Sequence, residues 1–239
     1  MILGIGGAAQ PTQEITEEEE ELLWEKGILG SSTPQQLIKT LFYLIGVHFA
    51  LRGGQEHHQL RAGADSQFSI RTDLDSGAQY LQYDPGTDIK GSKAEPPARV
   101  YKASNPARCV VELYKKYLSL CPSPRPPQFY LKELKNPTPR CWYAKVPKGR
   151  HTLVGVVKSL CDEAGLQGNY SNRSLRATAV ARLYNQRNEG INYKRNEPTK
   201  RPINAVLSGD PFKRKRTCPP SDYCAQPPLD LSKNSTNKS

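Results

Sequence analysis

Apolar residues recur with a helical period in several stretches of the chain. Between Leu37 and Phe49 the period is clear, and Thr33-Pro34 with Gln36 precedes it. This combination is typical of a helix start, because threonine caps the free N–H groups and proline is tolerated in the first turn. Comparable patterns bounded by caps, glycines or prolines predict the other helices. Helices are expected near residues 17–24, 34–49, 55–61, 109–120, 151–164 and 170–185.

The middle of the chain changes to an alternating pattern. Residues 67–71 alternate polar and apolar side chains, as a half-buried strand does, and Ser76-Gly77 can turn the chain into a second strand over residues 79–83. Residues 98–101 are a candidate third strand, and residues 129–131 are expected to be extended. The order of helices, sheet and helices predicts an α+β fold that is mostly α, with a small antiparallel sheet.

The amino-acid composition indicates which class of partner the protein binds. The 239 residues carry a net charge of +11 with a pI of about 9.4, which indicates a polyanionic partner such as nucleic acid. A membrane is not expected as a partner, because the mean hydropathy is −0.66 and no long apolar run occurs. The first ten residues lack a signal-peptide pattern, so an intracellular chain is expected. The cysteines form no C-x-x-C pair, and neither a metal nor a cofactor is expected.

Charge and composition also divide the chain. We expect a disordered N-terminus over residues 1–14, an ordered core over residues 15–195 and a basic, disordered tail over residues 196–239. In the tail, Lys213, Arg214, Lys215 and Arg216 resemble a nuclear localisation signal. Residues Pro228, Leu229, Asp230, Leu231 and Ser232 match the PxDLS peptide that C-terminal-binding-protein corepressors capture.

The predicted helix over residues 170–185 carries candidate chemistry. Arg173 and Arg176 are three residues apart in its first turn, so they project as neighbours. Guanidinium groups beside the free N–H groups of a helix start are suited to a phosphate, because both donate to oxygen. The alternative is an ordinary solvated helix face.

Several segments combine with this helix into a family pattern. The upstream segment HFALRGGQEHHQLR (residues 48–61) and the helix segment NRSLRATA (residues 172–179) are its most specific pair. With LLWEKGILGSSTP (22–34), WYAKVPKGRHTL (142–153) and NYKR (192–195), they resemble the catalytic core of tyrosine recombinases. The resemblance is strongest to the Crypton-derived branch found in zinc finger MYM-type proteins and a glutamine-rich relative, and it covers residues 15–195.

This resemblance implies roles for particular residues. In the family, a tyrosine attacks a DNA phosphodiester, two arginines stabilise the charged transition state, and a lysine from a sheet hairpin protonates the leaving oxygen. Arg52 and Arg176 then correspond to the arginines and Tyr193 to the nucleophile. Lys90 and Lys93 both remain candidates for the lysine, and Arg52, Arg173 and Arg176 are the expected DNA contacts.

The chain also departs from the family pattern. Arg173 stands where members usually have a histidine, and arginine cannot act as a base at neutral pH. Tyr193 follows Arg176 by seventeen residues with no Gly-His segment between them. These departures favour a nuclear, transposon-derived protein that binds DNA and no longer recombines it. Two alternatives stay open: an active recombinase or integrase that uses Tyr193, and a transcriptional adaptor that recruits a corepressor through its tail.

Side chains outside this pattern have structural explanations. His57 and His58 lack partners at metal-ligand spacing, which favours packing or surface roles. Trp142 and Tyr143 are expected in the core rather than as a platform for stacked bases.

Overall fold

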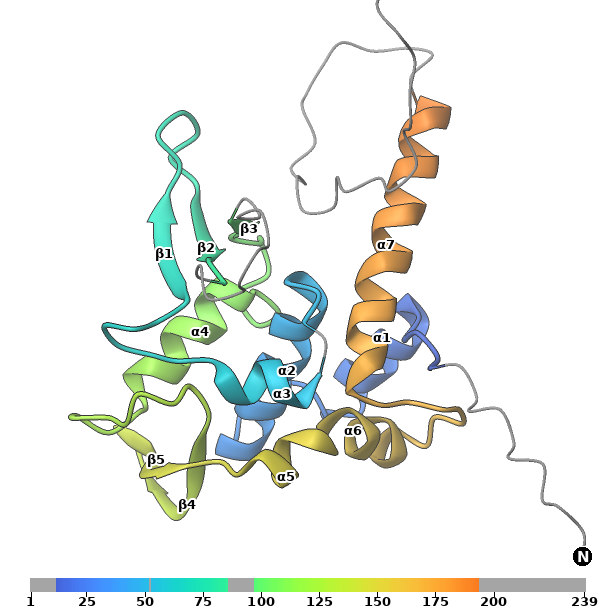
Figure 1. Ribbon diagram of the computed structural model, residues 1–239. Coiled ribbons are helices and arrows are strands. Elements are labelled where there is room, and N and C mark those ends of the chain that lie inside the picture. Colours follow the sequence, from blue (N-terminus) through green and yellow to red (C-terminus); the bar gives the residue numbers. More distant parts are fainter. Residues whose placement is uncertain (1–11, 52, 86–96, 194–239) are drawn as a thin grey trace, which may run out of the picture. The chain divides into compact units, whose positions relative to one another are not determined.

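The computed structural model describes residues 12–51, 53–85 and 97–193, which all belong to one compact unit (Figure 1). The helices are α1 (Glu17–Glu25), α2 (Pro34–His48), α3 (Gly54–Gln59), α4 (Val110–Ser119), α5 (Arg150–Val154), α6 (Val156–Ala164) and α7 (Asn172–Tyr193). The strands are β1 (Phe68–Thr72), β2 (Gln79–Tyr83), β3 (Ala98–Tyr101), β4 (Leu131–Thr138) and β5 (Cys141–Pro147). This confirms the mixed architecture with small antiparallel sheets.

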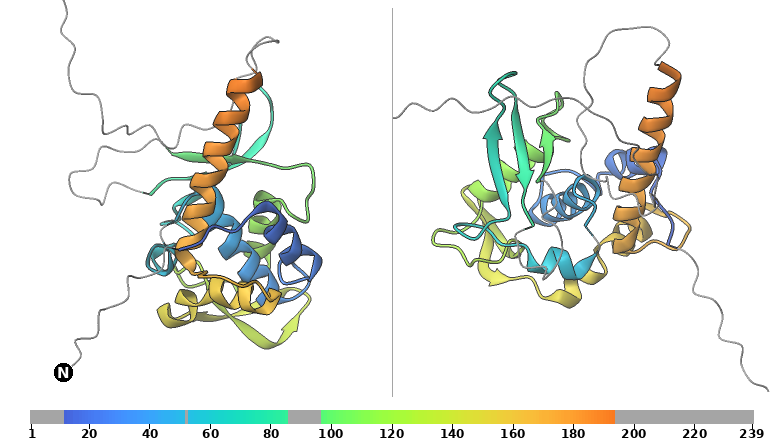
Figure 2. Two further views of the ribbon diagram at one scale, coloured as in Figure 1. Left: turned by 90° about the vertical axis from the view of Figure 1, so that its right-hand side faces the viewer. Right: turned by 45° about the horizontal axis from the view of Figure 1, so that its top comes forward.

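Helix α2 is the centre of the core. Its cap is as predicted, since the Thr33 hydroxyl accepts a hydrogen bond from the Gln36 N–H at 3.2 Å. The helix is buried around nearly its whole circumference, because α7, α4, α6 and β4 all contact it. Figure 2 shows the three-stranded sheet on one side of α2 and α7 on the other.

The three-stranded sheet has the order β1-β2-β3, and both pairings are antiparallel. The predicted strands over residues 79–83 and 98–101 are confirmed. Phe68 packs against Phe49 from the end of α2, with ring centroids 5.3 Å apart, and Tyr83 completes the cluster. Aromatic burial therefore attaches the sheet to the central helix.

A second sheet, formed by β4 and β5, was not predicted. Its first strand contains Lys132, Lys135 and Asn136-Pro137, which are poor strand formers. Its register is interrupted between Leu131 and Thr138. Contacts with distant parts of the chain stabilise this hairpin, whose first strand has a low β propensity. Tyr143 is almost fully buried, and its hydroxyl donates to the Pro34 carbonyl at 3.1 Å, which ties the hairpin to the start of α2.

Two predicted helices differ from the structure, one in a break and one in its end. The predicted helix over residues 151–164 is divided at Gly155 into α5 and α6, and it ends at Gly165 in the left-handed conformation as expected. Helix α7 continues to Tyr193, beyond the predicted end at Asn185. Among the described residues, no helix is both long and apolar enough to cross a bilayer.

Candidate functional site

The site begins at the C-terminal end of α2, where the helix stops in a sharp turn. Ala50 adopts the left-handed conformation with φ of 52°, and the Leu51 N–H donates to the Gly46 carbonyl at 3.2 Å. This pairing is a Schellman motif, here built on alanine rather than the usual glycine. The turn reverses the chain into the glycine pair before α3, as the glycine-marked break in the sequence predicts.

The first turn of α7 lies directly against this reversal. A Cβ atom on Gly46 would come within 2.3 Å of the Leu175 Cδ1, so glycine permits this close approach without a shift of the leucine side chain. A Cβ atom on Gly53, whose φ of 118° also requires glycine, would lie 3.6 Å from the Asn172 Cβ. The structure therefore brings together the two sequence segments that carry the family resemblance.

Asn172 joins a third segment to the site. Its side-chain amide donates to the Leu153 carbonyl at 2.7 Å, and its Oδ1 accepts from the Val157 N–H at 3.2 Å. These are backbone groups on the two sides of the break at Gly155. The cap of α7 is supplied by Ser171, whose hydroxyl accepts from the Arg173 N–H. Ser171 therefore caps the helix, while Asn172 ties its first turn to the break at Gly155.

The two arginines of α7 differ in environment. Arg176 is half-buried, and its Nη1 lies 3.5 Å from the Ala50 carbonyl, at the weak limit of a hydrogen bond. Arg173 is exposed. Arg52 lies outside the described residues. Of the residues close to it in sequence, Ala50 lies against Arg176 of α7, and Gly53 lies against Asn172.

The other candidate residues are distributed less favourably for catalysis. Because α7 is one continuous helix, the backbones of Arg176 and Tyr193 are separated by about 25 Å at 1.5 Å per residue. Lys90 and Lys93 lie outside the described residues, in the connection between the paired strands β2 and β3.

Helix α7 is fixed by contacts that the sequence did not reveal. The Thr178 hydroxyl accepts from the Ile15 N–H at 2.8 Å, and Arg182 forms a partly buried ion pair with Glu20 of α1. Tyr43 donates to the same carboxylate at 3.1 Å, and burial together with Glu20 raises the pKa of this phenol well above its ordinary value. Arg182 is one of several arginines in the helix, and Glu20 is one glutamate in a run, so no local pattern identifies the pair.

His57 is part of the core beneath the site. Its ring stacks on Phe42 at 3.7 Å, and its Nδ1 lies 2.8 Å from the Tyr130 hydroxyl. The Nε2 is buried without a hydrogen-bond partner, and burial lowers the pKa of His57 to about 3. The imidazole is therefore neutral at physiological pH, in agreement with the predicted packing role.

The two aromatic residues of β5 lie in or near the core. Tyr143 is in the core as expected, and Trp142 is half-buried with the Lys116 ammonium over its ring. No cluster of metal-ligating side chains occurs within the part of the chain that the structure describes. The basic run 213–216 and the peptide 228–232 lie outside the described residues.

Comparison with known protein families shows that residues 14–162 match the family described as "Domain of unknown function (DUF3504)". Among curated proteins, zinc finger MYM-type protein 3 of Mus musculus is 29% identical over 175 residues, which cover 63% of this chain and 13% of the relative. Zinc finger MYM-type protein 2 of Mus musculus is 31% identical over 159 residues, 58% of this chain and 12% of the relative. The transcriptional regulator QRICH1 of Homo sapiens is 28% identical over 152 residues, 56% of this chain and 19% of the relative.

These matches confirm the predicted relationship to zinc finger MYM-type proteins and their glutamine-rich relative. The chain spans less than a fifth of the length of each of them. Among solved structures, the XerH site-specific recombinase bound to palindromic difH substrate has a TM-score of 0.48 and 20% identity. That match covers 80% of this chain and 47% of the recombinase.

Acidification should destabilise the protein through His57. The folded-state pKa of about 3 lies below the unfolded value of 6.5, so the unfolded chain binds the extra proton between these values and stability is lost as the pH falls below 6.5. The loss from this residue between pH 7.5 and 5 should be about 2 kcal/mol. Urea unfolding of wild type and His57→Gln at both pH values measures it. The variant should lose about 2 kcal/mol less, and equal losses would contradict the assignment.

Proposed function

The chain belongs to the DUF3504 family, and we propose that it is a transposon-derived, tyrosine-recombinase-like domain of the Crypton type. On this proposal it acts in the nucleus, binds duplex DNA through phosphate contacts and does not recombine it. The observation that carries the proposal is the convergence at the first turn of α7. There, Arg176 lies against the Ala50 carbonyl in the turn that ends α2, although more than a hundred residues separate the two in sequence.

The chemistry of this convergence fits a phosphate group. The Ala50 carbonyl engages one nitrogen of Arg176, and the guanidinium has further donors for a ligand oxygen. Arg173 adds a second, exposed guanidinium on the same helix turn. The net charge of the whole chain is +11, which favours DNA as a partner because DNA binding is driven by neutralised phosphates. Such contacts need only charge and position, and both are available here.

The arrangement of α7 supports binding without catalysis. A nucleophile must reach the phosphate that the arginines hold, whereas Tyr193 is about 25 Å along the helix from Arg176. Arg173 cannot supply the proton transfers of the histidine it replaces. Because catalytic groups act as a unit, the loss of more than one removes most of the rate acceleration. The alternative, an active recombinase or integrase, would require α7 to break between Arg176 and Tyr193.

A second candidate function rests on the tail sequence. Pro228 to Ser232 present every defining position of a peptide that C-terminal-binding-protein corepressors capture, and Lys213 to Arg216 would direct the chain to the nucleus. One relative is named a transcriptional regulator, which is compatible with such a role. In this adaptor function the folded core would contact DNA or a partner while the tail recruits the corepressor.

DNA binding should be strong at low salt and should weaken steeply as salt is added. Arg176→Ala should reduce the slope of log affinity against log salt by about 1, because the protein then neutralises one phosphate fewer. The reduction should be similar for unrelated DNA sequences, since phosphate contacts read no bases. Fluorescence anisotropy with labelled duplexes measures both effects.

The matched control for this experiment is Arg71→Ala. Arg71 is an exposed arginine on β1, whose Nε donates to its neighbour Ser69 at 3.2 Å. The substitution removes the same charge away from the site and should leave the slope within error of wild type. Salt-independent binding, or equal effects of the two substitutions, would remove the support for a phosphate site at α7.

No covalent DNA adduct should form. A duplex nicked beside the scissile phosphate traps the phosphotyrosyl intermediate of an active recombinase, which a denaturing gel shows as a shifted band. Wild type and Tyr193→Phe should both give unshifted protein, because the tyrosine is far from the arginines. A shifted band in wild type that disappears in Tyr193→Phe would establish the recombinase alternative.

The tail peptide should bind a corepressor independently of the core. Substituting Asp230→Ala and Leu231→Ala together should abolish the pull-down of a purified C-terminal-binding protein, because the peptide loses its defining side chains. The melting temperature of the core should not change. Equal recovery by wild type and the double variant would show that the peptide match is accidental.

A further inference from the structure

The β4–β5 hairpin concentrates positive charge to an unusual degree. From residue 131 to residue 150 the chain carries a single acidic residue, Glu133, among many basic ones. That carboxylate is already engaged, because it forms an ion pair with Lys148 at 2.8 Å in which the side chains are only 15% and 13% exposed. The remaining cations of the hairpin, which are all exposed, are Lys132, Lys135, Arg140 and Lys145.

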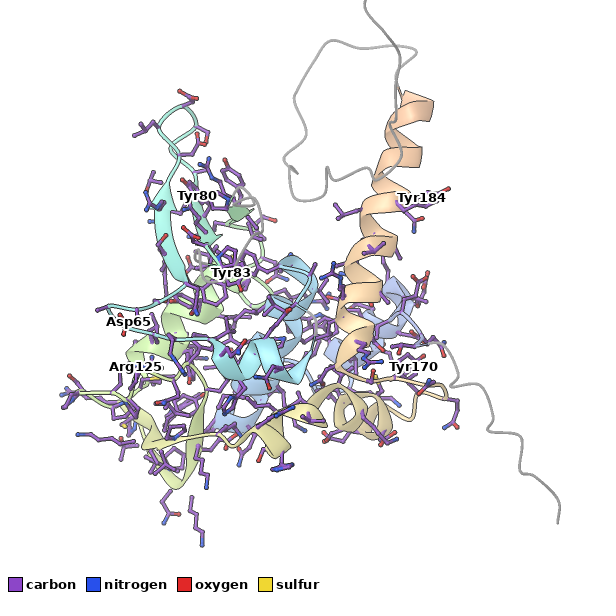
Figure 3. The ribbon with its side chains drawn as sticks, viewed as in Figure 1. Asp65, Tyr80, Tyr83, Arg125, Tyr170 and Tyr184 are labelled. Carbon is purple, nitrogen blue, oxygen red and sulfur yellow. The ribbon has the colours of Figure 1, made fainter. Side chains whose placement is uncertain are left out.

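These four cations lie on a hairpin that hydrogen bonds fix to the rest of the core. The Trp142 N–H donates to the Leu120 carbonyl at 2.8 Å, the Lys148 N–H to the Tyr130 carbonyl at 2.9 Å, and the Tyr143 hydroxyl to Pro34. The buried face of the hairpin is therefore fixed to the body, while the tip over residues 136–140 is entirely exposed. Figure 3 shows side chains of the hairpin directed outward from the body. A fixed ribbon loses little conformational entropy when it meets a ligand.

The hairpin is connected to the arginine site by one short helix. β5 leads directly into α5, which ends at the site: its Leu153 carbonyl accepts from Asn172, and its Val154 backbone lies 3.2 Å from where a Cβ on Gly54 would be. Figure 1 shows β5, α5 and α6 following one another along the same side of the body. Arg150, exposed at the start of α5, continues the positive charge between the two regions.

We propose that the β4–β5 hairpin is a second duplex-DNA contact, in which Lys132, Lys135, Arg140 and Lys145 bind backbone phosphates beyond those held at α7. This rests on the proposed DNA binding and extends it, since the family resemblance assigns no role to these residues. Phosphates recur along both strands of a duplex, so a rigid basic ribbon and an arginine site on connected elements can engage one DNA molecule together. The hairpin would add affinity without sequence preference.

The test compares two charge-matched variants of the full chain. The hairpin variant replaces Lys132, Lys135, Arg140 and Lys145 by Gln. The control replaces Lys26, Lys102, Arg108 and Lys158 by Gln, cations that already engage the Ala164 carbonyl, Glu112, Glu21 and Asp162. Both lose the same formal charge, so a general effect of net charge would be equal in the two. Circular dichroism melting confirms that each variant is folded.

The salt dependence of affinity for a labelled duplex distinguishes the outcomes. The hairpin variant should bind at least about tenfold more weakly at 0.1 M salt, with a slope reduced by about 0.9 for each phosphate that is no longer neutralised. The control should keep the slope of wild type. Equal slopes for the hairpin variant and wild type would overturn the hairpin proposal while leaving the arginine site intact. Absence of salt-dependent binding in wild type would overturn both proposals.

Discussion

The close approach of α7 to α2 at Gly46 is the constraint on which the arrangement of the site depends. A Cβ atom there would come within 2.3 Å of the Leu175 Cδ1 and 3.1 Å of its Cβ, so a larger residue would require Leu175 to shift. This contact sets the first turn of α7 against the end of α2, where Ala50 accepts from Arg176. It also covers His57, whose neutral ring fills the core behind the glycine.

Helix α7 is held to the rest of the core by its first half, and its second half continues as far as Tyr193. Its first half is held by Asn172, Thr178 and Arg182, each of which contacts a different part of the chain. Its continuity to Tyr193 then separates the candidate nucleophile from the arginines. A phosphate-binding surface survives such a separation, because each charge acts on its own phosphate. A catalytic centre does not, because its groups must meet at one atom.

The two proposed phosphate contacts, the α7 arginines and the basic hairpin, would be encoded in the sequence in different ways. The arginines are in segments with a specific family pattern, and their contact depends on glycines that permit close backbone approach. The hairpin has no such pattern, and its contribution would come from charge density on a rigid ribbon. Its one carboxylate, Glu133, is neutralised within the hairpin by Lys148, which leaves the outward cations available to an external anion.

The sequence by itself determined the helices around Thr33 and Gly165, the strands of the larger sheet and the pairing of the two arginine segments. The helices and strands follow from caps and alternation, which act over a few residues, whereas the pairing of the arginine segments was implied by the family resemblance. Only the tertiary structure decided the β4–β5 hairpin, the break at Gly155 and the continuity of α7. Each of these depends on partners far away in sequence, such as Pro34 for Tyr143 and Asn172 for the groups freed at Gly155. Local propensity contains no information about such partners, because they are brought near only when the chain folds.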